Sequence, residues 1–403
     1  SVFASSLLEA AGVAKTEEVE AQLLDDMDMD LEMESGITRK LNTARMQVSS
    51  DKGEDFVLNL VDTPGRADFA YEVSCSLAAC EGALLIIDAT KGVQAQTIAN
   101  YALAVDYDLK IIPVLSKVDV PTADCQKVSA EVKDAIGLDC SNAIRCSASS
   151  GLGLKEVISA IIDQVPPPGD AAKALLRMLV FDSFYDEDRG DIVSMVRVVD
   201  GYVFRGQGIH FMNSGKDSVV EELGIMIGGL REPADCLRAG EVGYLVSSVS
   251  RVDDSRIGET IVAAGTQVKL QALPGFTIAE PAVFCGVFPE DGTGYDTLRA
   301  AFQRLALDDA AITYAAENSS TLGLGFRCGF VSMLHLQAVR ERFDKECMAE
   351  LIFTVPSVEY NCLMSDGSVQ SIQWANLLPE TEDVHEVQEP YVSLEVIVPE
   401  QHA

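Results

Sequence analysis

The chain has 403 residues, of which 48% are apolar and 23% charged, and its formal net charge is −33. This composition is that of a soluble globular protein long enough for two or three domains, and no run approaches the roughly 20 apolar residues of a membrane-spanning helix. The excess of acidic residues argues against unaided binding to nucleic acid, because phosphate contacts require Lys and Arg.

Ten cysteines are spread singly through the chain, and none forms a C-x-x-C pair. Most of them, such as Cys80 and Cys285, have apolar neighbours in the sequence, which is typical of reduced core residues. The cysteine pattern therefore favours a reducing compartment and gives no support for a metal site.

The first part of the chain alternates between helical and strand patterns. Residues 2–12 have the apolar spacing of a helix that ends at a Gly. Apolar runs at 56–61 and 83–87 each end at an Asp and are one helix apart, which predicts a parallel βαβ unit. A further buried strand is expected at 109–115. Ligands of such sheets bind at the carboxyl ends of the strands.

After the proline-rich linker at 166–169, the pattern changes to short strands separated by Gly turns. Even spacing of this kind predicts a β-barrel, with strands at 192–199, 202–204 and 243–246 among others. Beyond a second linker at 273–275, strands and helices follow in the order βαββαβ, which predicts a split βαβ sandwich. Its expected elements are strands at 282–287, 312–314 and 349–354 and helices at 295–307 and 333–346.

Three short motifs follow one another in the order that guanine-nucleotide-binding proteins use: Gly36-Ile37-Thr38, Asp62-Thr63-Pro64-Gly65 and Ser116-Lys117-Val118-Asp119. The Thr38 hydroxyl and the Asp62 carboxylate suit Mg²⁺, and the Gly65 amide suits a γ-phosphate. Asp119 can accept two hydrogen bonds from the guanine ring while Lys117 lies along the base, and Ser147-Ala148 can offer a backbone N–H to the guanine oxygen. Each motif alone is commonly a cap or a turn, but their joint order favours a nucleotide site.

These motifs and several longer stretches resemble LepA, also called elongation factor 4, a family of translational GTPases related to elongation factor G. The stretches include 61–69, 76–83, 92–97 and 322–330, and the resemblance covers essentially the whole chain. It implies a multidomain protein. The implied parts are an α/β G domain with a mostly parallel sheet over 1–170, a β-barrel domain II over 174–265, a ferredoxin-like α+β domain III over 275–375, and the first strand of a truncated further domain over 388–403.

The resemblance also implies GTP or GDP and Mg²⁺ as cofactors. Ser1 falls at the position of the phosphate-loop Ser or Thr, so the loop itself is missing, and the 403-residue chain is expected to bind GTP poorly. The expected magnesium ligands are Ser1, Thr38 and Asp62. Nucleotide contacts are expected from Ser1, Thr38, Asp62, Gly65, Ser116, Lys117, Asp119, Ser147 and Ala148.

Four positions depart from the family pattern. The catalytic positions are Gly65 and Arg66, and Arg66 stands where the family has the His that orients the attacking water. A guanidinium is always protonated and cannot accept that hydrogen bond, so we expect slower turnover. Ser116 replaces an Asn and is too short to bridge the base and the phosphate loop, so guanine affinity is expected to be reduced. Ser149 replaces a Lys and Ser35 replaces an Arg, and four departures in one site indicate relaxed catalysis.

The resulting hypothesis is a ribosome-dependent GTPase that hydrolyses GTP to GDP and phosphate during protein synthesis. Its implied partners are ribosomal RNA and ribosomal proteins, bound through domains II and III by a monomer. The implied location is the bacterial cytoplasm or the matrix of a mitochondrion or plastid, with peripheral membrane association. Two alternatives stay open: a pseudo-GTPase that binds the ribosome or a partner without turnover, and an elongation factor G-like translocase.

Overall fold

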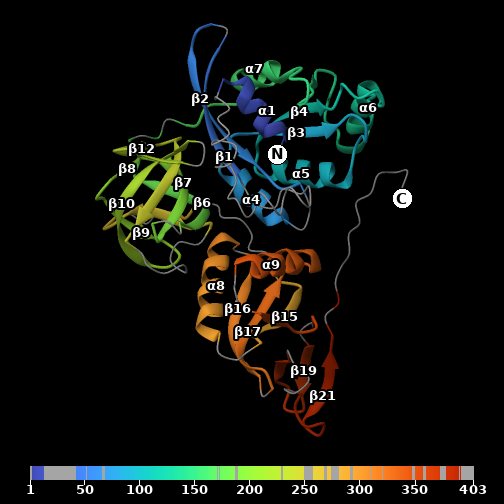
Figure 1. The fold of residues 1–403 in the computed structure, drawn as a ribbon, viewed down its shortest axis with the longest axis vertical. Coiled ribbons are helices and arrows are strands. Elements are labelled where there is room, and N and C mark those ends of the chain that lie inside the picture. Colours follow the sequence, from blue (N-terminus) through green and yellow to red (C-terminus); the bar gives the residue numbers. More distant parts are fainter. Residues whose placement is uncertain are drawn as a thin grey trace. The chain divides into compact units, whose positions relative to one another are not determined.

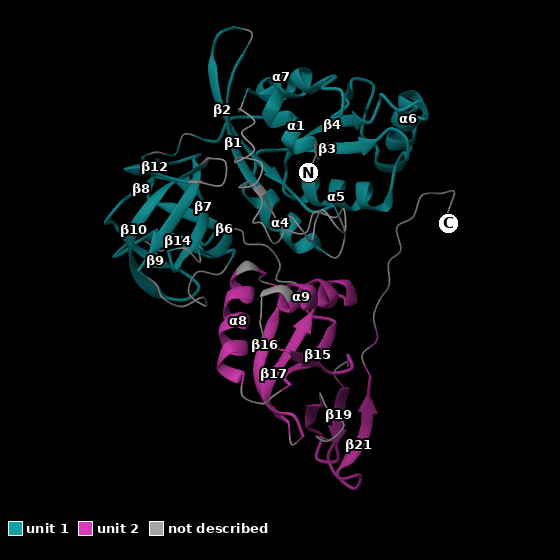
Figure 2. Cartoon of the chain, in the orientation of Figure 1, with its two compact units in different colours: residues 1–277, 397–403 teal, residues 278–396 magenta. Residues whose placement is uncertain are grey.

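The computed structural model forms two compact units, unit 1 up to residue 277 and unit 2 over residues 278–396 (Figure 2). No helix in the described part of either unit is both long and apolar enough to span a membrane. The residues that the structure describes are 2–12, 42–50, 52–65, 69–169, 171, 173–186, 189–227, 230–248, 257–266, 270–273, 281–290, 294–309, 311–319, 321–346, 350–356, 360–372, 378–389 and 391.

A parallel sheet of three strands, in the order β3-β4-β5, lies in the first part of unit 1 (Figure 1). Helices cross over between its strands, as a parallel connection requires, and bring the carboxyl ends of the strands to one edge. The elements are β3 (Gly82–Asp88), α5 (Ala95–Asp106), β4 (Lys110–Ser116), α6 (Cys125–Ile136), β5 (Ile144–Arg145) and α7 (Leu154–Gln164).

The strand expected at 56–61 is present as β2 (Asp55–Asp62), but its predicted parallel pairing with the strand after it is wrong. β2 forms an antiparallel hairpin with β1 (Asn42–Ser49), and within the described residues no strand ladder joins β2 to β3. The strand, the helix α4 (Ala70–Ala78) and β3 still follow in the expected order. The periodicity of a strand predicts its length and its buried face, whereas its neighbour depends on segments far away in the sequence.

One hydrophobic core joins the hairpin to the parallel sheet. Met46 and Val48 of β1 are buried together with Ile112 and Val114 of β4. Helix α1 (Val2–Ala10) supplies Leu7, which is fully buried in the same core, and α7 contributes Val157 and Ile158.

Six antiparallel strands of unit 1 form a closed ring, because the last strand of the sheet bonds back to an inner one. Around the ring the order is β6 (Arg177–Asp186), β7 (Asp191–Asp200), β13 (Val242–Ser247), β10 (Lys216–Ile227), β9 (Gly208–Phe211) and β14 (Thr260–Ala263). β11 (Leu230–Pro233) extends from β10, and β8 (Tyr202–Phe204) pairs with β12 (Cys236–Arg238).

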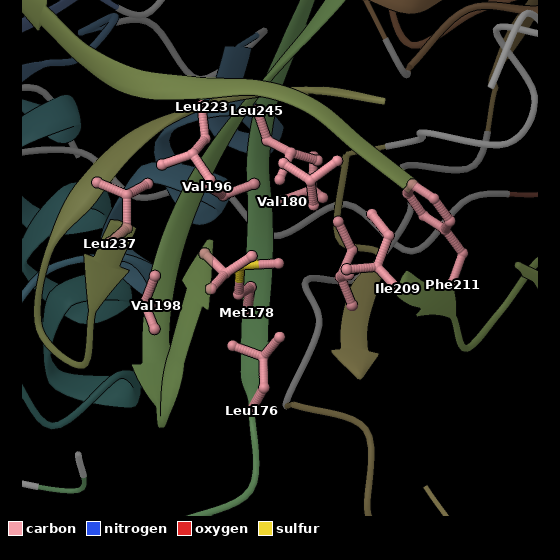
Figure 3. Close-up of a cluster of buried hydrophobic side chains, with 13 residues drawn as sticks. Leu176, Met178, Val180, Val196, Val198, Ile209, Phe211, Leu223, Leu237 and Leu245 are labelled. Atoms are coloured by element: carbon pink, nitrogen blue, oxygen red, sulfur yellow. The ribbon is translucent and has the colours of Figure 1, made fainter. Parts of the chain in front are cut away.

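The inside of the ring is filled with aliphatic side chains and one Phe (Figure 3). Residues alternate along each strand, so that Val196 and Val198 of β7 point inward together with Met178 and Val180 of β6. Because these side chains are almost fully buried, the ring is a packed core and not a pore.

Unit 2 contains the βαββαβ order that the sequence predicts. Its sheet has the order β16-β17-β15-β18, and every neighbouring pair is antiparallel. Aromatic rings hold the two helices to the sheet: the ring of Phe302 lies 5.2 Å from that of Phe326 and 4.7 Å from that of Phe343. The elements are β15 (Val283–Pro289), α8 (Tyr295–Asp308), β16 (Thr313–Ser319), β17 (Gly323–Phe330), α9 (Met333–Glu346) and β18 (Leu351–Phe353).

A small antiparallel sheet that the sequence analysis missed follows this sandwich. It consists of β19 (Tyr360–Met364), β20 (Val369–Ile372) and β21 (Val384–Gln388), in the order β20-β19-β21. The strand expected within 388–403 lies mostly outside the described residues: Gln388 ends β21, and Tyr391 is not in a strand.

Candidate functional site

The carboxyl ends of the three parallel strands carry the polar residues of the candidate site. Asp88 ends β3 and Ser116 ends β4, which runs directly into Lys117 and Asp119. The segment after β5 begins with Cys146 and continues through residues 147–149. Hydrogen bonds tie the segments together: Cys146 N–H donates to the Leu115 carbonyl at 2.8 Å, and Val118 N–H donates to the Cys146 carbonyl at 3.3 Å.

Lys117 is fixed by its backbone and by its side chain. Its φ of 58° lies in the left-handed region, which is unusual for a residue other than Gly. Its Nζ lies 2.8 Å from Asp88 Oδ2, while Asp88 Oδ1 accepts hydrogen bonds from the backbone and hydroxyl of Thr90. Burial alone would raise the pKa of Asp88, but the bonds from Lys117 and Thr90 outweigh burial and lower it.

Asp119 is exposed and interacts with serine hydroxyl groups of the loop after β5. Ser149 Oγ donates to Asp119 Oδ2 at 3.1 Å, and the hydroxyl oxygens of Ser147 and Ser149 are 3.0 Å apart. Hydrogen bonding by Ser147, and to a lesser degree by Ser149, lowers the pKa of Asp119. The carboxylate therefore stays ionised, which is the form that accepts hydrogen bonds from ring N–H groups.

The loop that carries these serines is held tightly. Ser147 is fully buried, and its backbone N–H donates to the Leu152 carbonyl at 2.9 Å. The hydroxyl of Ser6 in α1 donates to the Ala148 carbonyl at 3.1 Å. Because the Ser147 N–H is already bonded, Ala148 is the candidate of the expected Ser147-Ala148 pair for donating a backbone N–H to a base.

The remaining expected residues fall into two groups. Asp62, at the end of β2, is partly buried, and Gly65 is exposed after the buried Pro64. Ser116 turns its hydroxyl toward β3 and donates to the Ile87 carbonyl at 3.2 Å. Ser1, Thr38, Arg66 and the departure at Ser35 lie outside the described residues.

The described donors and acceptors suit the base of a guanine nucleotide. Asp119 offers an ionised and exposed carboxylate, which complements the ring N–H groups of guanine, and Lys117 lies two residues before it. For Mg²⁺, Asp62 is the one expected ligand that is described, and its carboxylate is a ligand type that Mg²⁺ prefers. The described residues contain no group of three or more metal-ligating side chains.

Two contacts of the site were missed by the sequence analysis. Asp88 was noted only as the end of a strand, although it holds Lys117. Ser6 was seen only as part of the first helix, although it binds the loop after β5 across 142 sequence positions. A polar residue at the end of a parallel strand was the available signal for Asp88. The helical pattern offered no comparable signal for Ser6.

Residues 1–167 match the family model described as the elongation factor Tu GTP-binding domain. "Elongation factor 4" of Thermosynechococcus vestitus is 48% identical over 400 residues, and "Elongation factor 4" of Microcystis aeruginosa is 47% identical. Each match covers 99% of this chain and 66% of the relative. The "Translation factor GUF1 homolog, chloroplastic" of Physcomitrium patens is 46% identical over 402 residues, which are 54% of its own length.

A solved crystal structure from Thermus thermophilus resembles the fold with a TM-score of 0.67. The likeness covers 90% of this chain and 66% of that one, at 16% sequence identity, so it concerns the fold alone.

Proposed function

The chain belongs to the elongation factor 4 family, and on that premise we propose that it binds GTP and hydrolyses it to GDP and phosphate on the ribosome. The chain spans 66% of the length of the elongation factor 4 relatives compared above. The activity of the whole relatives is therefore proposed for this chain.

The observation that carries the proposal is the Asp119 carboxylate at the carboxyl end of the parallel sheet. It is exposed, hydrogen bonding by Ser147 and Ser149 lowers its pKa, and its Oδ2 accepts the Ser149 hydroxyl. In the proposed role it accepts the two N–H groups of the guanine ring, so it selects guanine over adenine. Lys117 lies along the base, and Ala148 N–H donates to the guanine oxygen.

The resemblance assigns Ser1, Thr38 and Arg66 to the phosphate end of the site, together with Asp62 and Gly65. In the proposed roles Ser1, Thr38 and Asp62 hold Mg²⁺, which would neutralise phosphate charge, and the Gly65 N–H meets the γ-phosphate. Arg66 stands at the position of the water-orienting His. A guanidinium cannot accept a hydrogen bond from water, so we propose slow turnover.

We also propose that the ring-shaped β-domain over 174–265 and the sandwich over 275–375 bind ribosomal RNA and proteins, with residues 1–170 as the G domain. The organisms of the relatives support a bacterial cytoplasm or a plastid as the location. The relatives' names give no support for a mitochondrial location or for membrane association.

The test compares turnover of GTP and ATP, with and without ribosomes, in a protein in which a phosphate loop is joined ahead of Ser1. Ribosome-stimulated GTP turnover that rises when Arg66 is changed to His would support both the reaction and the role of this position. If the protein with Arg66 shows only background turnover and Arg66→His hydrolyses GTP, the protein is a pseudo-GTPase. If the protein turns over GTP and ATP equally well, the role given to Asp119 is wrong.

A further inference from the structure

Helix α4, which follows the Asp62–Gly65 turn, has two buried faces. Tyr71, Cys75 and Ala79 are spaced four residues apart, which puts them on one face of the helix. Val73 and Leu77 lie on another face and pack with α5. The first face meets the ring, since α4 contacts β6. Burial raises the pKa of Cys75, and the charges of Glu72 and of Asp182 on β6 raise it further.

The outer surface of the ring is apolar where it meets α4. Along β7, Val193, Met195 and Arg197 alternate with the residues that fill the interior. Their cross-strand partners on β13 extend the same outer surface. A single cluster of buried and partly buried side chains joins this surface to the hairpin and to the end of α4, and it includes Phe181, Val193, Met195, Tyr244, Val246, Ala79 and Val61.

Arg197 lies at the end of this row and makes the polar contacts across it. Its guanidinium donates to the Ala79 carbonyl, at the C-terminal end of α4, and pairs with the Glu81 carboxylate just before β3. Only 12% of its side chain is exposed. Removing the partners of a buried guanidinium is costly, so Arg197 strongly favours one position of Ala79 and Glu81.

The ring therefore contacts both ends of one segment. Val61 directly precedes Asp62, and Ala79 directly follows α4, so residues 62–78 lie between two contacts with the ring. This segment contains Asp62 and Gly65, the proposed contacts of Mg²⁺ and the γ-phosphate. If a change in the turn shifts α4 along its axis, either the ring must move with α4 or the contacts of Arg197 must break.

We propose that Arg197 is a positioning residue for the GTPase reaction, acting by holding the end of α4 and the start of β3 against the ring. The proposal rests on the proposed function, since it assigns the ring the role of setting the position of the Asp62–Gly65 turn. Among the described contacts, Arg197 meets none of the proposed nucleotide-binding residues. Arg197 therefore influences the Asp62–Gly65 turn indirectly, through the position of α4.

Hydrogen–deuterium exchange of the 403-residue chain, without nucleotide, tests the contact itself. Arg197→Met keeps the aliphatic part of the side chain and removes its hydrogen bonds. We expect exchange in residues 70–82 to become faster by roughly tenfold or more, because charge-assisted hydrogen bonds are lost. Arg177→Met is the matched control, since Arg177 also forms an ion pair on the ring, 2.5 Å from Asp200, and its described side-chain contacts include neither Ala79 nor Glu81.

Unchanged exchange in 70–82, or equally faster exchange in all strands of the ring, would overturn the proposal. If Arg197→Met does not fold, the pair Arg197→Glu with Glu81→Arg decides the matter. The exchanged pair should fold and protect 70–82 more than Arg197→Glu alone, and equal protection of the two would count against the proposed pairing.

Ribosome-stimulated turnover, in the protein with a phosphate loop joined ahead of Ser1, tests the role in the reaction. Arg197→Met should lower kcat by roughly tenfold while KM for GTP changes less than about twofold. The reason is that Arg197 positions the turn but does not contact the residues proposed to bind GTP. Arg197→Lys should recover part of kcat. A rise in KM at constant kcat would contradict the positioning role. If the unmodified protein hydrolyses no GTP, the proposed function fails, and the exchange experiment still decides whether Arg197 holds α4.

Discussion

Ser149 donates its hydroxyl hydrogen to Asp119 across 3.1 Å, so the carboxylate proposed to read the guanine ring already carries a hydrogen bond from the loop after β5. The bond joins residues 30 positions apart in the sequence. Ser149 stands where the resemblance implies a Lys. This bond is therefore one contact by which the chain differs from the family pattern.

Changing Ser149 to Ala should raise the pKa of Asp119 toward the ordinary value of an Asp, because one of its donors is removed. Guanine binding requires the ionised carboxylate and is lost as the pH falls through this pKa. The loss should therefore occur at higher pH in Ser149→Ala. Carbon-13 NMR titration of Asp119, together with binding of fluorescent GDP, measures both effects. Ser150→Ala is the control, because Ser150 meets Ser147 through its backbone N–H; an equal shift in both variants would refute the assignment.

Changing Asp88 to Asn should lower the free energy of unfolding by roughly 1 kcal/mol at neutral pH, because the ion pair with Lys117 is lost. The pKa of Asp88 is lowered in the fold. Its contribution is therefore present above the ordinary pKa of an Asp and disappears as the pH falls through the folded pKa. Urea unfolding at neutral and acidic pH measures the difference. In a double-mutant cycle with Lys117→Met, the two changes should not add, and full additivity would show that the pair contributes nothing.

Gly153 has a φ of 75°, and a Cβ there would lie 2.1 Å from the Arg145 carbonyl oxygen. Gly151, two residues earlier in the same loop, has a φ of 73° with open space around it. We expect Gly151→Ala to cost about 1 kcal/mol of stability, from the backbone alone. Gly153→Ala should cost roughly 2 kcal/mol more, because the backbone must also move. Thermal and urea unfolding compare the two variants, and equal costs would mean that the loop gives way without strain.

Glu259 is 3% exposed and accepts backbone N–H groups from Asn213, Ser214 and Thr260. Burial raises its pKa despite these bonds. Its contribution to stability is therefore complete below the ordinary pKa of a Glu and is lost as the pH rises through the raised value. Glu259→Gln cannot titrate, so its curve of unfolding free energy against pH should lack this decline. Urea unfolding across the acidic range measures it, with Glu232→Gln on β11 as a control for the loss of one charge. Parallel curves for wild type and Glu259→Gln would contradict the assignment.

The sequence predicted those elements whose buried residues recur at a regular spacing. Strand 202–204 and helix 333–346 have the expected bounds. The sheet of β19, β20 and β21 was missed because its strands are short and mostly exposed. Cys362 and Ile372 are its buried residues in the described part, so the pattern that reveals a strand is almost absent.

The family was predicted from local motifs, and the comparisons confirm it. What the motifs could not supply was side-chain contact between distant segments. The pairs Lys117–Asp88 and Ser149–Asp119 join the ends of different strands, and their formation depends on the register of the parallel sheet. The contact of Arg197 with Glu81 spans 116 positions. Composition would have placed such a cation on the surface, whereas the packing of α4 against the ring buries it.

The bond between β9 and β10 leaves the six strands of the ring without an open edge among themselves. Open edges are where strands of a second molecule add and where aggregates begin to grow. On heating, intermolecular β-structure should therefore start from the sheets that keep open edges, among them the β1–β2 hairpin and the small sheet of β19, β20 and β21. The six strands of the ring would join only after the ring has itself come apart.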